Sequence, residues 1–273
     1  MLDITCAYGL DFLFPSNDII VGGALRRAGE FARPEVDIIV AMLARLRGTY
    51  IDVGANIGSI ALPVAATSHG SRVIAIEASR HLANVLAANA LNNRLANVDV
   101  HHAAAGVAAG LVRVPTPSLG MALNFGAISL TAPDQAGLPH EEVRMCALDK
   151  LAPNDTRIVK LDVEGYENDV LDGAQALLAR RSAAWIVEHK PDDERSLRLG
   201  QRLIDAGYRL FWMWTPVVTP TSPKRAAGPF TSGDFNIFAI FNDEPPVAMT
   251  EVADLRTPPK ATAAYPYLKQ YGY

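Results

Sequence analysis

Residues 49–59 form the feature that most constrains the fold of this chain. An apolar run there leads into an acidic residue, two spaced glycines and the start of a helical pattern. The run ends at Asp52 and Val53, and Gly54 and Gly58 follow it. A glycine turn between a strand and a helix brings backbone N–H groups and the helix N-terminus close to a ligand. The pattern predicts a strand–turn–helix unit of a parallel sheet, with a ligand site at the turn.

The position of Asp52 separates two classes of ligand. A dinucleotide-binding loop has the spacing G-x-G-x-x-G, which places a pyrophosphate on the helix end. Here Gly54 and Gly58 lack the intervening glycine, and Asp52 precedes them, where a carboxylate repels a pyrophosphate and attracts a cation. The loop therefore favours S-adenosylmethionine, which carries a sulfonium and an α-amino group and no phosphate.

Composition narrows the class of protein further. The 273 residues are 49% hydrophobic and 20% charged, with a formal net charge of −4. These values are typical of a globular protein, and no basic stripe indicates a nucleic-acid partner. The two cysteines are too far apart in sequence to form a disulfide framework or a zinc motif. No signal peptide or membrane-length apolar run is evident, so we expect a cytoplasmic protein without a membrane span.

Strand and helix patterns alternate from residue 50 onward, which indicates a mostly parallel sheet with helices on both faces. The final two strands are joined without a helix, which favours an antiparallel last strand, as in class I (Rossmann-like) methyltransferases. Pro63 lies inside a predicted helix and is expected to bend it or to remove a hydrogen bond. Strands are predicted over residues 50–53, 72–76, 98–101, 157–161, 184–187, 208–214 and 236–241, and helices over 34–46, 57–66, 81–92, 167–180 and 196–206.

Three segments are predicted along the chain. Residues 1–48 form an N-terminal cap, residues 49–243 an S-adenosylmethionine-binding methyltransferase domain, and residues 244–273 a tail that wraps the domain or meets a partner. Either the cap or the tail is a candidate contact for a homo-oligomer. Residues 110–148 interrupt the alternation with two short apolar runs, which predicts a hairpin-like insertion with a long, functional loop.

Ligands of open parallel sheets bind at the carboxyl ends of the strands, so the residues there are the site candidates. Glu77 ends the second strand, where a carboxylate accepts hydrogen bonds from both hydroxyls of a ribose. The alternative is that Glu77 caps the next helix. After the third strand, Ala104 leaves room for a flat adenine.

Residues 160–167 (KLDVEGYE) place a lysine and three acids at the end of the fourth strand. Charged groups at such a position must be paired or solvated. One alternative is structural: Lys160 pairs with Glu167, while Asp162 or Glu164 caps the helix. The fifth strand then ends in Glu188 and His189, again at the edge where the cleft should open.

Two motifs together resemble FkbM-type S-adenosylmethionine-dependent methyltransferases. Residues 52–58 (DVGANIG) are similar to the first motif of that family, and residues 160–167 to its second. The similarity extends to 170–171, 173–174 and 147–151 (ALDKL), and to Asn236 on the final strand. The first motif is shared by many methyltransferases, and the pair at this spacing is more specific. The cap and the tail lie outside the resemblance.

The resemblance implies a class I methyltransferase fold and O-methylation of a sugar or another small hydroxyl-bearing metabolite. It implies that Asp162 lies beside the methionine part of the donor or the reacting centre. Asn124 and Ser129 resemble a segment that lines the cofactor side of the cleft. The implied cofactor-binding residues are Asp52, Gly54, Asn56, Gly58, Glu77, Asn124, Ser129 and Asp162.

Methyl transfer to an alcohol needs alignment with the methyl–sulfur bond and a base for the hydroxyl proton. The candidate bases are Asp162, Glu188 and His189. Alternatively, Asp162, Glu164 and Glu188 bind Mg²⁺ or another divalent cation that lowers the alcohol pKa. Two other functions stay open: a nucleotide-dependent oxidoreductase, and a non-catalytic scaffold that binds partners through the tyrosines of its tail.

Overall fold

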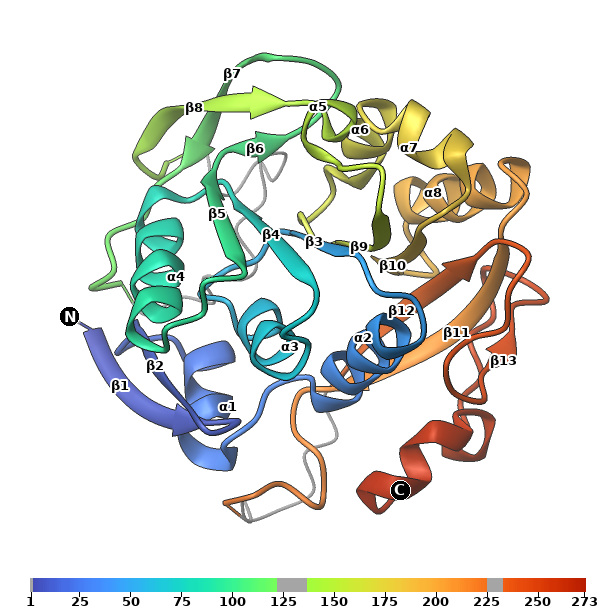
Figure 1. Ribbon diagram of the computed structural model, residues 1–273, viewed down its shortest axis with the longest axis horizontal. Helices are drawn as coiled ribbons and strands as arrows, with labels where there is room; N and C mark the ends of the chain where they lie inside the picture. Colours follow the sequence, from blue (N-terminus) through green and yellow to red (C-terminus); the bar gives the residue numbers. More distant parts are fainter. Residues whose placement is uncertain (1, 122–136, 225–232) are drawn as a thin grey trace.

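A computed structural model describes residues 2–121, 137–224 and 233–273 of the chain. Its centre is an eight-stranded sheet in the order β13-β11-β12-β10-β9-β3-β4-β5 (Figure 1). The strands are β3 (Thr49–Val53), β4 (Arg72–Glu77), β5 (Val98–His102), β9 (Thr156–Leu161), β10 (Ala184–Glu188), β11 (Arg209–Pro216), β12 (Gly233–Ile240) and β13 (Thr250–Glu251).

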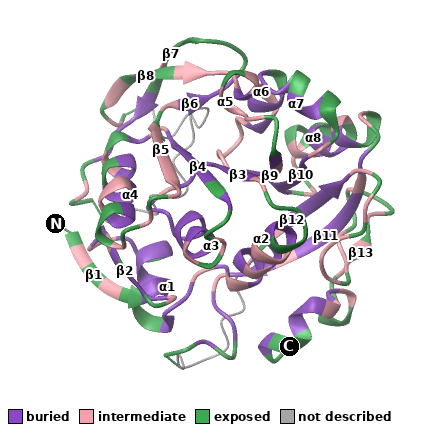
Figure 2. Ribbon diagram, viewed as in Figure 1, coloured by how far each residue is buried: buried purple, intermediate pink, exposed green. Residues whose placement is uncertain are grey.

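Strand directions confirm the predicted fold class. Neighbouring strands from β5 to β10 are parallel, whereas β12 runs antiparallel to both β10 and β11. The central strands β3 and β9 are almost entirely buried, which explains why they read as continuous apolar runs rather than as alternating patterns (Figure 2). Their carboxyl ends meet near the middle of the sheet, and the loops that follow them build the site.

Helices cover both faces of the sheet. Figure 1 shows α2 (Arg33–Arg45), α3 (Ala61–Thr67) and α4 (Arg80–Asn92) on one side. On the other side lie α6 (Glu167–Asp172), α7 (Gln175–Arg180) and α8 (Glu194–Asp205). A short helix, α5 (Leu148–Leu151), precedes β9.

Two predicted helices differ from the observed ones. The helix predicted over 57–66 begins only at Ala61, so Pro63 lies in its first turn, where no backbone N–H is needed. The predicted start of this helix at residue 57 is therefore wrong, and Pro63 in the first turn costs the helix no hydrogen bond. The helix predicted over 167–180 is broken into α6 and α7, because Gly173 packs directly on the backbone carbonyl of Gly106 and a Cβ atom there would collide with it.

The N-terminal segment is a hairpin of β1 (Leu2–Ala7) and β2 (Leu10–Pro15), followed by α1 (Val21–Ala28) and α2. The hairpin is fastened to α4 by Asn89, whose side chain accepts a hydrogen bond from Leu13 N and donates to the carbonyls of Leu13 and Ile57. Phe12 and Phe14 are buried in the same core cluster as the central strands. The predicted helix over 34–46 is α2.

The insertion contains the predicted hairpin. β7 (Gly110–Pro115) and β8 (His140–Cys146) pair antiparallel, and β6 (Ala104–Ala105) joins them along β8 to make a separate three-stranded sheet. The tip of the insertion, with Asn124 and Ser129, lies outside the described residues. β6 connects this small sheet to the end of β5, and so places the insertion beside the cleft.

The C-terminal tail packs on its own chain. β13 extends the main sheet along β11, and the 3-10 helices η3 (Thr262–Ala264) and η4 (Pro266–Tyr271) follow. Tyr265, Tyr267 and Tyr271 are buried, and the Tyr267 hydroxyl donates to the carbonyl of Trp214 at 2.8 Å. In the described part of the chain, no helix has the length and apolar character needed to cross a membrane.

Candidate active site

The turn after β3 is fixed by its backbone. Gly54 has φ +83°, and a Cβ atom there would collide with the Asp162 carbonyl oxygen. The amides of Gly54 and Ala55 both donate to the carbonyl of Ile76, at 2.9 and 3.0 Å. Asn56 is also left-handed, with φ +52°, and its side-chain oxygen accepts a hydrogen bond from Ile57 N at 2.7 Å. The loop is therefore a rigid, close-fitting edge and not a flexible connection.

Glu77, at the end of β4, connects this turn to the next helix. Its two carboxylate oxygens accept hydrogen bonds from Asn56 N at 2.9 Å and from Ser79 N at 2.7 Å. Burial raises the Glu77 pKa to about 7, against the effect of these two amides. The side chain that caps α4 is Ser79, which accepts from Leu82 N. Glu77 therefore keeps further acceptor capacity for a ligand, since each carboxylate oxygen has two lone pairs.

A cavity opens beside Glu77, and we call it the β4 cavity. Most of its lining residues are small or apolar, and the polar ones are Asn56, Glu77, Ser79, Asp162 and Glu164. Ala104 lies in this wall, as expected from its place after β5. The other wall residues include Ile76, Leu82, Ala103, Ala105, Val114, Val163 and Tyr166.

A second cavity, the β9 cavity, lies over the ends of β3, β9 and β10. It is lined largely by charged and polar groups, in contrast to the β4 cavity. The two cavities share Gly54, Asn56, Asp162 and Glu164, so they adjoin at the ends of β3 and β9. The polar residues that line the β9 cavity are Glu35, Asp52, Asn56, Ser59, Lys160, Asp162, Glu164, Glu188, Thr215, Asp234 and Asn236.

Lys160 is the buried cation at the base of the β9 cavity. It is paired in register with Asp52 on the neighbouring strand, and its side chain is only 5% exposed. Its Nζ lies 2.8 Å from Asp162 Oδ2 and 3.8 Å from Asp52 Oδ1. Burial opposes the charge, but the carboxylates of Asp162, Asp52 and Glu35 outweigh it and hold the Lys160 pKa above its usual value.

Glu167 hydrogen-bonds to backbone amides and does not form the ion pair with Lys160 that the sequence left open. Its Oε1 accepts hydrogen bonds from the amides of Val163 and Gly165, at 3.3 and 3.0 Å. These bonds hold the turn in which Glu164 has φ +49° and Gly165 φ +95°. A left-handed glutamate is strained, and such strain persists only where the surroundings fix it. Glu167 therefore supports the shape of the site, while Lys160 pairs with Asp162.

Three carboxylates converge at the ends of β9 and β10. Asp162, Glu164 and Glu188 each offer an oxygen within 4.8 Å of the others. Lys190 already lies on this group, with Nζ 3.3 Å from Glu164 Oε2 and 3.1 Å from Glu188 Oε2. Burial raises the Glu188 pKa to about 7, and repulsion by Asp162 and Glu164 acts in the same direction.

His189 is not brought into the cavities. It is absent from the described residues that line either of them, and both ring nitrogens are engaged elsewhere. Nε2 lies 2.7 Å from the Leu255 carbonyl oxygen, and Nδ1 lies 2.9 Å from Ser196 Oγ. Its ring also packs edge-on against Trp212. Adjacent residues of a strand point to opposite faces, which explains why Glu188 reaches the cleft and His189 the tail.

Gly58 shapes the turn but is absent from the described residues that line either cavity. Its φ is +88°, and its amide donates to the Ala55 carbonyl at 2.9 Å. Sequence reasoning also missed two wall residues, Glu35 of α2 and Asp234 of β12. Glu35 follows a proline at a helix start, where an acidic residue is common on the surface. Only the packing of α2 against the sheet reveals that Glu35 is buried.

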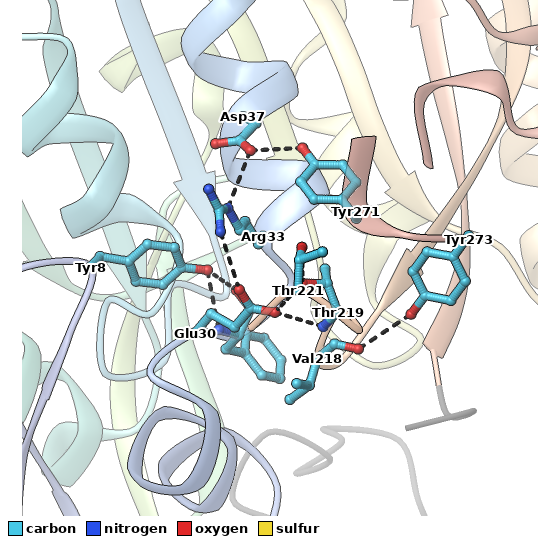
Figure 3. A network of polar contacts seen from close by, with 10 residues as sticks. Tyr8, Glu30, Arg33, Asp37, Val218, Thr219, Thr221, Tyr271 and Tyr273 are labelled. Atoms are coloured by element: carbon cyan, nitrogen blue, oxygen red, sulfur yellow. Dashed lines mark hydrogen bonds and ion pairs between the residues drawn. The ribbon is translucent and has the colours of Figure 1, made fainter. Parts of the chain in front are cut away.

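A polar network joins distant segments next in sequence to Phe31, Ala32 and Val217, which line the β9 cavity (Figure 3). Glu30 is fully buried, and its Oε1 accepts from the amide and hydroxyl of Thr219, at 2.6 and 2.7 Å. Arg33 lies between Glu30 and Asp37, and the Tyr271 hydroxyl donates to Asp37 at 2.7 Å. The network ties the start of α2 to the segment after β11 and to the tail.

Comparison with protein-family models identifies the family of the chain. Residues 52–210, more than half of the chain, match the family model described as methyltransferase FkbM domain. A comparison with curated proteins gives no match.

Solved structures similar to the chain include methyltransferases. One is the FkbM methyltransferase from Methylobacillus flagellatus, 19% identical over 70% of this chain, with a TM-score of 0.44. The chain spans 43% of that protein's length. Another is precorrin-6y C5,15-methyltransferase from Geobacter metallireducens, 15% identical over 76% of this chain and 87% of that one, with a TM-score of 0.47.

The fold assignment rests on the strand order and directions described above, and the family assignment on the match over residues 52–210. Both motifs that carried the resemblance, residues 52–58 and 160–167, lie inside the matched segment. The chain belongs to the FkbM family of methyltransferases.

Proposed function

We propose that the chain is an S-adenosylmethionine-dependent O-methyltransferase that acts on a hydroxyl of a sugar or another small metabolite. The observation that carries the proposal is the junction of the two cavities at Gly54, Asn56, Asp162 and Glu164. A donor that lies across this junction has its adenosine in the mostly apolar β4 cavity and its charged part at the acidic edge of the β9 cavity. The acceptor enters the remaining part of the β9 cavity.

The residues of the β4 cavity fit an adenosine. Glu77 accepts hydrogen bonds from the ribose hydroxyls, and the small side chain of Ala104 leaves space for the adenine. Gly54 allows the backbone to approach the donor, since any side chain there would collide with Asp162. On the other side of the junction, Asp52 and Asp162 provide negative charge for the sulfonium and the α-amino group. Asp52 Oδ1 is buried without a hydrogen-bond partner among the described residues.

Bound S-adenosylmethionine supplies an electrophilic methyl group, and the chain supplies position and a proton acceptor. Positioning accounts for a large part of such catalysis, because the oxygen must lie in line with the methyl–sulfur bond. Glu188 is the base that we assign, since its pKa of about 7 lets it take a proton near neutral pH. Asp162 pairs with Lys160 at 2.8 Å and lines both cavities at their junction. His189 is bound to Leu255 and Ser196 and acts as a structural residue.

A divalent cation is an alternative counter-ion for the same carboxylates. The three oxygen donors at Asp162, Glu164 and Glu188 suit Mg²⁺ chemically, but the Lys190 ammonium now lies on two of them. A cation would have to displace Lys190. Titration of Mg²⁺ into the protein by calorimetry decides this, since no heat of binding at millimolar Mg²⁺ would rule the cation out.

Two competing functions have less support. A nucleotide-dependent oxidoreductase needs a site for a pyrophosphate, whereas Asp52, Asp162 and Glu164 make the junction acidic. A scaffold that binds partners through its tail needs accessible tyrosines, whereas Tyr265, Tyr267 and Tyr271 are buried against the chain itself. A homo-oligomer through the cap or the tail stays a proposal, which gel filtration with light scattering tests.

Calorimetry with S-adenosylhomocysteine tests the proposed function. The wild-type protein should bind it, and Glu77→Gln should bind about tenfold more weakly, because a neutral amide loses the charge-assisted hydrogen bonds to the ribose. Glu142→Gln, on the exposed side of β8, is the matched control and should bind as the wild type does. Absence of binding to folded wild-type protein, or tighter binding of NADH, would overturn the proposal.

A further inference from the structure

The β9 cavity has a feature that donor binding does not explain. Glu35, from α2, lines the cavity although the residue is only 3% exposed. Its Oε1 is buried without a hydrogen-bond partner among the residues that the structure describes. A buried carboxyl oxygen without a partner is costly, so such a group in a cavity wall indicates a ligand that completes it.

Among the described residues, the two lysines that contact the carboxylates of the cavity form their ion pairs with acids other than Glu35. Lys160 Nζ lies 2.8 Å from Asp162, and Lys190 Nζ lies 3.1 Å from Glu188. Lys160 attracts Glu35 electrostatically, but Asp162, Asp52 and Asp234 repel it, and burial together with this repulsion raises the Glu35 pKa to about 8. The region around Glu35 therefore has more negative than positive charge, and an added cation would relieve the repulsion.

The surroundings of Glu35 indicate what kind of cation fits. The wall on its side is apolar and includes Val21, Phe31, Ala32 and Val217. Mg²⁺ and Ca²⁺ take six or more oxygen ligands, which these apolar side chains do not supply. An alkylammonium group differs, because its nitrogen donates to one or two carboxylates while its carbons contact apolar side chains and an aromatic ring.

We propose that the acceptor carries a protonated amine, which Glu35 in its ionised form holds in the β9 cavity, with Asp234 as a second negative group. This inference rests on the proposed function, which it deepens by naming the chemical class of the acceptor: an amino sugar or another hydroxyl-bearing amine. Asp234 lines the same cavity and lies near enough to Glu35 to repel it. The amine is the recognition handle, and the hydroxyl that receives the methyl group lies toward Glu188.

The amine itself is the smallest probe of this site. Isotope-labelled protein saturated with S-adenosylhomocysteine is titrated with methylammonium chloride and, separately, with methanol, its neutral counterpart. The ionic strength is held constant with sodium chloride. Methylammonium should give saturable NMR shifts at the amides of Glu35, Val217 and Asp234, with an affinity about tenfold or more above that of methanol.

Variants test whether Glu35 is responsible for the preference for methylammonium over methanol. Glu35→Gln keeps the size of the side chain and should remove the preference for methylammonium, and Asp234→Asn should reduce it. Glu142→Gln, an exposed glutamate on β8, is the matched control and should keep the preference. The proposal is overturned if methanol or sodium shifts the same amides as strongly, if methylammonium shifts none of them, or if Glu35→Gln keeps the preference.

Failure of this inference is distinguishable from failure of the proposed function. Affinity for S-adenosylhomocysteine is measured in the same samples, and Glu35 is absent from the described residues that line the β4 cavity. Tight cofactor binding without a methylammonium preference would leave the methyltransferase proposal intact and point to a neutral acceptor that hydrogen-bonds to protonated Glu35. Lack of cofactor binding would instead contradict the proposed function.

Discussion

Lys160 of β9 and Asp52 of β3 lie side by side in the sheet, with the lysine Nζ 3.8 Å from Asp52 Oδ1 and both side chains almost fully buried. One residue comes from each of the two motifs that identify the family. Their contact, together with the shorter one from Lys160 to Asp162, fixes the junction at which the two cavities meet. Lys160 therefore balances the charges of Asp52 and Asp162, as Lys190 does for Glu164 and Glu188.

Replacing Lys160 should destabilise the protein strongly. Lys160→Met leaves Asp52 and Asp162 without their common cation, and removal of one partner of a buried ion pair costs about 3–5 kcal/mol. Urea unfolding measures the change in the free energy of unfolding. Lys150→Met, at an exposed position of α5, is the control and should change it by less than about 0.5 kcal/mol. Similar values for the two variants would contradict the described role of Lys160.

A side chain at Gly54 should damage both stability and cofactor binding. Gly54→Ala places a Cβ atom against the Asp162 carbonyl, in a backbone conformation with φ +83°. Such strain costs about 1–3 kcal/mol, and displacement of the turn should weaken S-adenosylhomocysteine binding by about tenfold or more. Gly70→Ala is the matched control, because nothing lies within 4 Å of the Cβ position there. Unfolding midpoints and calorimetry should separate the two variants, and equal cofactor affinities would count against the site.

The identity of the base should be visible in the pH dependence of methyl transfer. A base acts when deprotonated, so with Glu188 at a pKa of about 7 the rate should rise with pH through neutrality and then level off. Glu188→Gln should lower the rate by about 10²–10⁴-fold and remove this rise.

His189→Gln should instead keep the pH profile and lower the unfolding midpoint, because it breaks the contacts with Leu255 and Ser196. If the rise of the rate with pH is lost in His189→Gln and kept in Glu188→Gln, His189 and not Glu188 is the base.

Buried acids should make the protein less stable as the pH rises. In the folded state Glu35 keeps its proton up to a pH of about 8, whereas in the unfolded chain it loses it near its usual pKa of 4.5. The folded state therefore binds more protons in this window, and the free energy of unfolding falls with increasing pH. Glu35→Gln cannot lose a proton, so its urea midpoint should fall less between pH 5 and pH 8 than that of the wild type. Parallel pH curves would show that the Glu35 pKa is not raised.

Much of the fold could be predicted from the sequence, because local patterns of apolar residues indicate the strands and their order. The strand before Gly54, the parallel alternation and the antiparallel last strand follow from apolar runs and from a missing helix between β11 and β12. The limits of helices were less predictable. α3 begins only at Ala61, four residues later than predicted, so Pro63 lies in its first turn. The break at Gly173 depends on contact with Gly106, which is distant in sequence.

Some residues of the candidate site could likewise be predicted from the sequence, and others could not. Asp52 and Glu77 lie at the carboxyl ends of β3 and β4, and Asp162 directly follows β9. Topology alone therefore brings them together at one edge of the sheet. Glu35 lies on α2, outside both motifs, and its burial depends on the tertiary packing of that helix. Glu188 and His189 are adjacent in sequence, but only the structure shows that one faces the cavity and the other binds the Leu255 carbonyl.

A crystal structure with S-adenosylhomocysteine is the most direct measurement of the central claim, that the donor lies across the junction of the two cavities. The account predicts ribose hydroxyls within hydrogen-bond distance of the Glu77 carboxylate, adenine beside Ala104, and the sulfur at Asp162, facing Glu188. An adenosine bound outside the β4 cavity, or a sulfur directed away from Asp162 and the β9 cavity, would contradict it.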